Sequence, residues 1–362
     1  MSLERKIRVL VVDDSAVVRR TISDALSFDP EIEVVGTACD PYVARDKILE
    51  LNPDVMTLDI EMPRMDGLTF LRILQQHRPM PIIIISSLTQ AGSKAALDAM
   101  EFGAVDVLAK PQSAWNLGHL RDDLARRVKG AVRARLNNLR PSASRSVPTG
   151  AVEATPGDYN SRQLIVMGAS TGGTEALKDV LTRLPDGLPG ILIVQHIPPI
   201  FSRTFAERLN EVCAMEVHEA KHGDEAKPGT VLIAPGDFHM VVNWENNAYR
   251  VQLRQDPPIH HTRPAVDMLF NSAARCAGAK ITGVLLTGMG RDGAQGMQQI
   301  KSNGGINLAQ NEDTCVVYGM PRAAVELGVV DRVLPLDHIP HAILHALREQ
   351  SPAKTHNNAA LK

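Results

Sequence analysis

Hydrophobic and polar positions alternate over residues 7–127 in five repeating units. Short runs rich in β-branched residues (RVLVV, EVVG, DVMTLD, PIIIISS and VDVLAK) are separated by amphipathic segments long enough for helices. In the first segment Val18, Ile22, Ala25 and Leu26 recur at spacings of three, four and seven, as on one face of a helix. The runs are apolar throughout, which is typical of parallel strands covered on both faces. The pattern therefore predicts a (βα)5 domain with a parallel sheet.

The alternation fades after residue 128 and returns near 163. The intervening stretch is rich in Ser, Pro, Gly, Ala and Arg, which indicates the end of a helix followed by a flexible linker. From 163 to 349 the runs LIVMGAS, ILIVQH, MEVHEA, TVLIAP, ITGVLLTGM and INLAQN predict strands, with helices between several of them. In HMVVNWENNAYRVQLRQ, Asn246-Asn247 separates two alternating runs and predicts a β-hairpin.

These patterns divide the chain into four parts. We expect a (βα)5 domain over 1–128, an interdomain linker over 129–160, a doubly wound α/β domain over 161–350 and a disordered tail over 351–362. With 362 residues, 44% hydrophobic and 22% charged, the chain has the composition of a soluble globular protein of about two domains.

Charge argues against a nucleic-acid partner. The net charge of −2 gives no overall attraction to nucleic acid or to an anionic membrane. One basic set stands out: Arg121, Arg126, Arg127, Lys129, Arg133, Arg135 and Arg140. Asp122 and Asp123 interrupt it, and no interleaved aromatic residues are present to stack on bases. We expect a solvated helix face between the two domains.

Cysteine usage and hydropathy favour a cytoplasmic location. The four cysteines are scattered without a C-x-x-C pair, as expected of free thiols in a reducing compartment. No apolar run approaches the roughly 18 residues that span a bilayer, and the N-terminus lacks a secretory signal pattern. We therefore expect no direct membrane insertion, although a membrane-bound partner stays open.

Polar residues with related chemistry follow four of the five predicted strands of the first domain. Asp13 and Asp14 close the first strand, Asp59 the third and Ser86 the fourth, and Lys110 follows the fifth. The carboxyl ends of parallel strands lie at one edge, where such folds bind ligands. Three carboxylates crowded there repel one another without a cation, and oxygen ligands suit Mg²⁺. The lysine and the hydroxyl would then suit a phosphoryl group.

This arrangement, with a proline after Lys110, resembles the phosphoacceptor receiver domain of bacterial response regulators over roughly residues 7–127. The resemblance implies that Asp59 is phosphorylated and that Asp13 and Asp14, together with Asp59, hold Mg²⁺. It further implies that Ser86 is the switch hydroxyl and that Lys110 contacts the phosphoryl group.

One position departs from the receiver pattern. Val107 stands three residues before the lysine, where many receivers carry an aromatic residue. The departure puts the usual aromatic rotamer switch in doubt, but not phosphorylation. The resemblance also implies a partner histidine kinase as the phosphodonor.

The segment LIVMGASTGGTEAL predicts a strand, a small-residue loop and a helix. Its GASTG, residues 168–172, fits the G-x-S-x-G pattern of a nucleophilic serine, Ser170. A glycine loop for a phosphate-bearing cofactor has the same context. However, the spacing is not G-x-G-x-x-G, and the next strand does not end in an acidic residue. The pattern alone leaves both interpretations open.

A serine nucleophile needs a base within hydrogen-bond reach. His196 ends the next strand and is adjacent to Ser170 if consecutive strands are neighbours. Asp292, after ITGVLLTGMGR, arrives at the same edge and would orient the imidazole. The order serine, histidine, aspartate differs from that of the α/β-hydrolases, so membership of that family is not expected.

Three motifs, GASTGG, QH followed by Pro198, and GMGRDG, together resemble the chemotaxis methylesterases (the CheB family), in which a receiver precedes the catalytic domain. The resemblance covers nearly the whole chain. It implies a phosphorylation-activated serine hydrolase with Ser170, His196 and Asp292 as catalytic residues and the backbone N–H of Met289 as an oxyanion donor. It implies no cofactor at the hydrolase site.

The implied substrates are glutamyl methyl esters of methyl-accepting chemoreceptors, together with particular glutamines that are deamidated. A chemotaxis histidine kinase would be the phosphodonor.

Two alternatives remain. A receiver-regulated transcription factor would need a helix-turn-helix output, which 163–349 does not show. A receiver-regulated enzyme that binds a nucleotide cofactor would use the 168–173 loop.

Two weaker features are set aside. HEAKH, residues 218–222, matches a zinc-protease pattern but sits in strand-like sequence rather than on a helix. His260, His261 and Arg263 lie among prolines, and we expect a solvated loop there.

Overall fold

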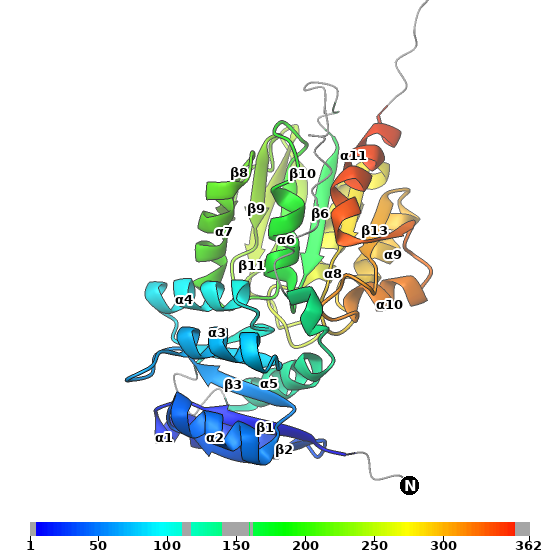
Figure 1. Cartoon of the computed structure of the whole chain (residues 1–362). Coiled ribbons are helices and arrows are strands. Elements are labelled where there is room, and N and C mark those ends of the chain that lie inside the picture. The colour runs from blue at the N-terminus through cyan, green and yellow to red at the C-terminus, as the bar shows by residue number, and fades with distance from the viewer. Residues whose placement is uncertain (1–4, 111–116, 140–158, 160–161, 352–362) are drawn as a thin grey trace, which may run out of the picture.

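The computed structural model describes residues 5–110, 117–139, 159 and 162–351 (Figure 1). Within these residues, no helix combines the length and apolar character needed to cross a bilayer. The predicted tail over 351–362 lies almost wholly outside the described residues, as does most of the predicted linker.

The N-terminal domain is the predicted parallel sheet with helices on both faces. Its strand order is β2-β1-β3-β4-β5, and every described pairing is parallel. The strands are β1 (Ile7–Val12), β2 (Ile32–Ala38), β3 (Val55–Asp59), β4 (Ile82–Ser86) and β5 (Asp106–Ala109). The helices are α1 (Ala16–Ser27), α2 (Pro41–Leu51), α3 (Gly67–His77), α4 (Gln90–Glu101) and α5 (Leu117–Val132).

Local sequence explains where these helices begin. Ser15, Asp40, Asp66 and Thr89 precede α1 to α4, and each side chain accepts a hydrogen bond from a backbone N–H of the first turn. Alternate residues of the strands then face different helices. Odd-numbered residues of β1 pack in the same apolar cluster as α1 and α5, and even-numbered ones with α2 and α3.

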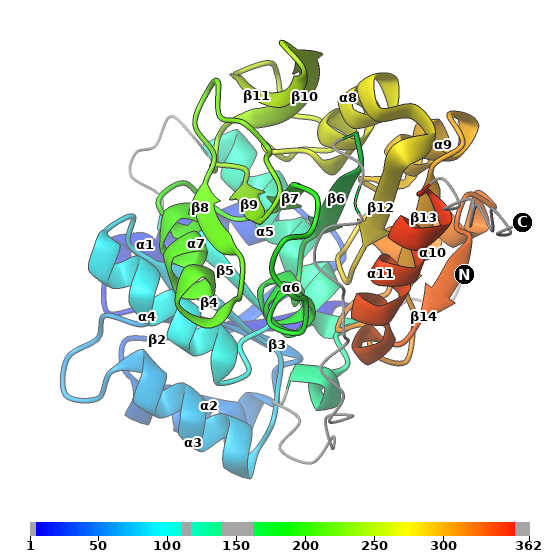
Figure 2. The same ribbon diagram turned by 90° about the horizontal axis from the view of Figure 1, so that it is seen from above.

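The C-terminal domain contains a second parallel sheet, ordered β14-β13-β12-β6-β7-β9-β8 (Figure 2). Its strands are β6 (Leu164–Ala169), β7 (Ile191–Gln195), β8 (Glu216–Glu219), β9 (Thr230–Ile233), β12 (Ile281–Leu285), β13 (Ile306–Gln310) and β14 (Arg332–Leu334). The fold class predicted from the sequence is confirmed, although the short edge strand β14 was not anticipated.

Helices cover both faces of this sheet. Ile165 and Met167 of β6 belong to the apolar cluster of α6, α7 and α11, whereas Leu164 and Val166 belong to that of α8, α9 and α10. The helices are α6 (Gly173–Leu181), α7 (Phe201–Val212), α8 (Val266–Ala277), α9 (Ala294–Ser302), α10 (Met320–Glu326) and α11 (Ile339–Glu349).

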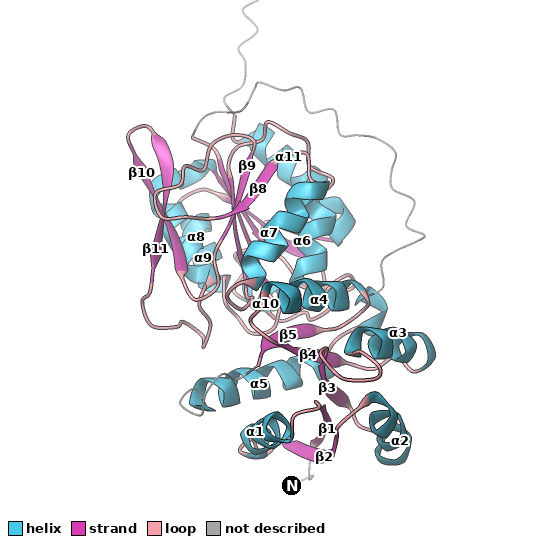
Figure 3. Ribbon diagram, turned by 90° about the vertical axis from the view of Figure 1, so that its left-hand side faces the viewer, coloured by secondary structure: helices cyan, strands magenta, loops and turns pink. Residues whose placement is uncertain are grey.

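The predicted hairpin is confirmed. Strands β10 (His239–Glu245) and β11 (Ala248–Arg254) are antiparallel, and Glu245 pairs with Ala248. Asn246 and Asn247 between them have φ values of 50° and 67°, in the left-handed region that asparagine tolerates. The hairpin packs on the outer side of α8, away from the sheet (Figure 3).

The two domains meet along α4 and α5 of the first domain. Leu97 of α4 shares an apolar cluster with Phe205 and Leu209 of α7. Lys178 of α6 donates to Glu101 at 2.6 Å. At this interface the α4 face of the first domain covers the carboxyl edge of the second sheet (Figures 1 and 3).

Beyond α5 the chain stays on the second domain. Arg135 N–H donates to the carbonyl of Val316 at 2.9 Å, and Asn138 Nδ2 donates to the carbonyl of Cys315 at 2.8 Å. Helix α5 itself ends at Val132. The boundaries at 128, 160 and 350 stay predictions.

Candidate active site and phosphoacceptor site

The predicted phosphoacceptor residues converge at the carboxyl edge of the first sheet. Asp13 and Asp59 are fully buried, and Lys110 Nζ lies 2.8 Å from Asp59 Oδ2 and 3.5 Å from Asp13 Oδ2. Asp14 is exposed, yet its carboxylate lies within 4.8 Å of the other two. The buried Ser86 hydroxyl, at the end of the neighbouring strand, donates to the carbonyl of Gly92 at 3.1 Å.

This carboxylate group has the electrostatics of a cation site. Burial raises the pKa of Asp59 to about 6, because the repulsion from Asp13 adds to desolvation and outweighs the hydrogen bond from Lys110. Burial likewise raises the pKa of Asp13. Asp13 Oδ2 is buried without a hydrogen-bond partner in the described part of the chain. A buried carboxylate oxygen without a hydrogen bond, beside two more carboxylates, fits Mg²⁺.

Val107 is buried in β5 and packs into the apolar core. It therefore fills space without supplying an aromatic ring, as the sequence indicated.

Tight packing requires the small residues of the serine loop. Gly172 has a φ of 75°, which an L side chain rarely adopts. At Gly173 an added Cβ would lie 2.1 Å from Gln195 Oε1. The chain can therefore leave β6, turn and enter α6 within four residues, and Ser170 is left at the turn with only 4% of its surface exposed.

Strand register places Ser170 beside His196. Ala169 of β6 pairs with Gln195 of β7, so the serine and the histidine follow directly at the same edge. The His196 N–H also donates to the carbonyl of Ala169 at 3.1 Å. The expectation that β6 and β7 are neighbours is confirmed.

His196 and Asp292 form a buried pair, with 2.8 Å between His196 Nε2 and Asp292 Oδ2. An ionised carboxylate only accepts hydrogen bonds, so Nε2 carries the proton. The lone pair of a neutral imidazole then lies on Nδ1, which is buried without a partner among the described residues. The Ser170 hydroxyl, equally, makes no hydrogen bond within the described chain. The histidine thus keeps a free basic nitrogen, and its strand end is adjacent to that of Ser170, without a hydrogen bond between the two side chains among the described residues.

Helix α8 holds the Asp292 carboxylate. Oδ2 accepts from the N–H of Val266 at 2.7 Å, and Oδ1 accepts from that of Asp267 at 2.9 Å. Burial alone would raise the pKa of Asp292, but the hydrogen bond and charge of His196 and these two N–H groups outweigh it and lower the pKa. The carboxylate also sits at the positive end of the helix dipole.

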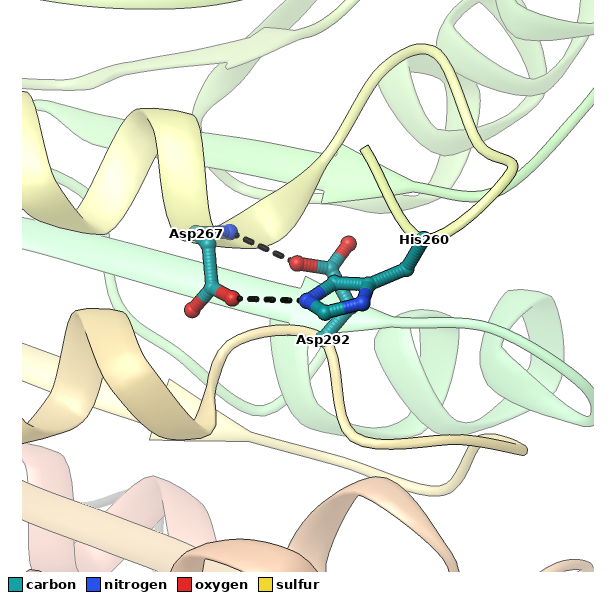
Figure 4. A group of neighbouring side chains, drawn as sticks. All are labelled: His260, Asp267 and Asp292. Carbon is teal, nitrogen blue, oxygen red and sulfur yellow. Dashed lines mark hydrogen bonds and ion pairs between the residues drawn. The ribbon is translucent and has the colours of Figure 1, made fainter. Parts of the chain in front are cut away.

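The capping is reciprocal: Asp292 caps α8, and Asp267 of α8 caps the helix that follows Asp292. Asp267 Oδ1 accepts from the N–H of Gly293 at 3.0 Å and from that of Gly296 at 2.7 Å, so it caps α9. Its Oδ2 accepts from His260 Nε2 at 3.3 Å (Figure 4). Burial, followed by repulsion from Asp292, raises the pKa of Asp267. Sequence reasoning missed Asp267.

His260 lies on an exposed loop, as expected, and its ring, with a side chain that is 35% exposed, also reaches Asp267. The three groups drawn in Figure 4 are close enough to form a metal-ligand cluster. However, every carboxylate oxygen in it already accepts a hydrogen bond. The HEAKH motif lies partly in β8 and has no helical spacing, as predicted.

The predicted oxyanion donor lies next to the serine. An added Cβ at Gly288 would lie 2.8 Å from Ser170 Cβ, so the backbone preceding Met289 touches the nucleophile. The Met289 N–H donates no hydrogen bond within the described chain and is available to a ligand.

Gln195 joins the nucleophile to the base. Its Nε2 donates to the carbonyl of Ser170 at 2.9 Å and to that of His196 at 3.2 Å. Sequence analysis noted Gln195 only as a strand end. Its role depends on side-chain direction, which the motif does not carry.

The first domain contacts the residue after the nucleophile. Thr171 Oγ1 donates to Asp106 Oδ2 at 2.8 Å, and the other oxygen of Asp106 accepts from Arg127. All three side chains are buried. Arg127, which we expected on a solvated helix face, is therefore part of the domain interface.

Two family models match the chain. "Response regulator receiver domain" covers residues 9–120, and "CheB methylesterase" covers residues 165–343. Together the two domains define a response regulator with an enzymatic output domain.

Full-length relatives identify the family. A protein-glutamate methylesterase/protein-glutamine glutaminase of Syntrophus aciditrophicus is 52% identical, covering 94% of this chain and 98% of the relative. One of Bdellovibrio bacteriovorus is 47% identical over 97% of this chain and 100% of its own. The crystal structure of the Thermotoga maritima CheB methylesterase catalytic domain is 41% identical with a TM-score of 0.50, covering 51% of this chain and 97% of that one. The chain belongs to the CheB methylesterase family.

Family membership confirms the enzyme class predicted from the sequence, and neither the transcription regulator nor the nucleotide-cofactor enzyme is favoured. The roles of individual residues stay predictions.

The raised pKa of Asp59 gives a testable pH dependence of stability. Its folded-state pKa of about 6 exceeds the unfolded value near 3.8, so ionisation of Asp59 disfavours the folded receiver. Asp59→Asn removes that cost. In EDTA, its free energy of unfolding relative to wild type should therefore rise by about 2.5 kcal/mol between pH 4 and pH 8. Denaturant titrations measure this difference. The exposed control Asp46→Asn should change by less than about 0.5 kcal/mol, and a gain for Asp59→Asn that shrinks with pH would contradict the argument.

The reciprocal cap makes Asp267 a positioning residue. Asp267→Ala removes the acceptor that holds Gly293, so the Asp292 loop shifts and kcat should fall by about 10- to 100-fold while KM changes little. Asp267→Asn keeps an oxygen for the same N–H groups and should retain kcat within about threefold. Steady-state kinetics of both variants give the answer. Equal losses in both would assign the effect to charge rather than to the cap.

Proposed function

We propose that the chain is a protein-glutamate methylesterase and protein-glutamine glutaminase that acts on methyl-accepting chemoreceptors and is activated by phosphorylation. The observation that supports the proposal is the buried His196–Asp292 pair, whose Nδ1 has no partner among the described residues, at a strand end adjacent to that of Ser170. Proteins with this activity in their names are about half identical to the chain over nearly its whole length.

The proposed reaction begins at Ser170. Its oxygen attacks the ester carbonyl carbon while His196 Nδ1 takes the hydroxyl proton. Asp292 orients the ring through Nε2 and stabilises the imidazolium that forms. His196 then returns the proton to the departing methoxy group, which leaves as methanol. A water molecule repeats the sequence on the acyl-enzyme and releases the glutamate side chain.

The oxyanion that develops needs fixed donors. The unengaged N–H of Met289 supplies one, and the positive end of α6 adds favourable potential. Attack on a glutamine amide passes through the same kind of tetrahedral intermediate, and the amide nitrogen leaves as ammonia. One site therefore serves both reactions.

Replacing the nucleophile tests the hydrolase. Ser170→Ala should lower kcat at least about a thousandfold, because the remaining groups cannot form the acyl-enzyme. Hydrolysis of receptor methyl esters, followed by methanol release, measures the effect. Near-normal turnover in this variant would remove Ser170 from the mechanism.

A fluorophosphonate probe gives an independent control. Wild type should be labelled at Ser170 in the presence of a chelator, and Ser170→Ala should not. Labelling abolished by the chelator would instead indicate a metal enzyme.

The receiver is proposed to keep the serine site closed. Ser170 is nearly buried, and its neighbour Thr171 is bonded to Asp106 at the start of β5. At the other end of this short strand lies Lys110, bonded to Asp59. Phosphorylation of Asp59 by a histidine kinase changes the partner of Lys110 and thereby loosens the contact at Asp106. Asp13, Asp14 and Asp59 would hold Mg²⁺, which when bound offsets their negative charge.

Blocking the phosphoacceptor tests the switch. Asp59→Asn has no carboxylate to phosphorylate, so a small phosphodonor with Mg²⁺ should leave its esterase activity unchanged. Asp46→Asn, an exposed change in the same domain, should respond like wild type. The measurement is the rate of ester hydrolysis with and without phosphodonor. Activation of Asp59→Asn would place the switch elsewhere.

A further inference from the structure

An arginine-lined cleft opens between the two domains beside the active site. It has a volume of about 660 Å³ and lies between the segment after α5, the Met289–Arg291 turn and residues 316–323. Its charged lining residues are Arg133, Arg135, Arg291, Arg322, Glu312 and Glu326. Four guanidinium groups face two carboxylates, although the whole chain carries a net charge of −2.

Two of these arginines have no ion-pair partner among the residues that the structure describes. Arg135 pairs with Glu312 at 2.8 Å, and Arg322 pairs with Glu326 at 2.7 Å. Arg133 and Arg291 are exposed and form no ion pair within the described part of the chain. Like charges on one cleft repel one another, so these two groups are satisfied best by an external anion.

The cleft lies next to the serine loop, although Ser170 itself does not line it. Met289 lines it and follows Gly288, whose backbone touches Ser170. Val316 also lines it, and an added Cβ at Gly172 would lie 2.6 Å from the Val316 side chain. Only Gly288 separates Ser170 from the cleft-lining Met289, so residues that flank a side chain bound at Ser170 are within reach of these arginines.

We infer that this cleft binds carboxylate side chains that flank the scissile ester of the substrate polypeptide. The inference rests on the proposed function. Guanidinium groups form paired hydrogen bonds with carboxylates, which a single ammonium point charge does not match. A polypeptide that carries esterified glutamates also carries unesterified ones, and each turnover adds another carboxylate. Arg291 and Arg133 are thus specificity residues that select acidic segments.

Two synthetic peptides test the inference with the full chain, activated by a small phosphodonor and Mg²⁺. Both carry one glutamyl methyl ester, flanked on both sides by glutamates in one peptide and by serines in the other. For wild type at low ionic strength, kcat/KM should be roughly tenfold higher for the glutamate-flanked peptide, and the ratio should approach one in about 0.5 M NaCl.

Variants then locate the effect. Arg291→Gln should reduce the ratio to about threefold, and the double variant Arg133→Gln/Arg291→Gln should bring it to about one. Arg275→Gln, an exposed arginine at the end of α8 without an ion pair among the described residues, should keep the wild-type ratio. A ratio near one for wild type, or a ratio unchanged in the double variant, overturns the inference. Hydrolysis of neither peptide overturns the proposed function instead.

Discussion

The active site depends on one carboxylate that is shared between a helix and an imidazole. Asp292 accepts hydrogen bonds from two N–H groups of α8 and from His196. The charge that orients the base therefore also caps the N-terminal end of a helix. Asp267, in the first turn of that helix, in turn caps α9. The turn that carries Met289 and Asp292 is therefore held by two helix ends in addition to its own glycines.

A second constraint is the shortness of β5. The strand runs only from Asp106 to Ala109, with the phosphoacceptor lysine just beyond one end and the contact to Thr171 at the other. Although β5 is the edge strand of its sheet, only its four residues separate the two contacts. In the proposed switch, a change in the bonding of Lys110 therefore reaches the domain interface over a short distance.

Sequence patterns predicted what depends on periodicity and on strand ends. Both parallel sheets, the hairpin at Asn246-Asn247 and the pairing of His196 with Asp292 follow from such patterns. Asp267, Gln195 and Arg127 could not be predicted, because an aspartate near a helix start, a glutamine in a strand or an arginine on a helix is usually solvated. Their roles depend on contacts with residues far away in the sequence, and a local sequence pattern does not record such contacts.

The anchoring of the segment after α5 has a consequence for how the enzyme is silenced. Arg135 and Asn138 attach this segment to residues 312–316 of the catalytic domain. In the proposed switch, a receiver that moves away at α4 stays tethered within a few residues of its docking surface. Its return would be a unimolecular event at a high effective concentration. Under that proposal, shut-off after dephosphorylation does not depend on the concentration of the enzyme.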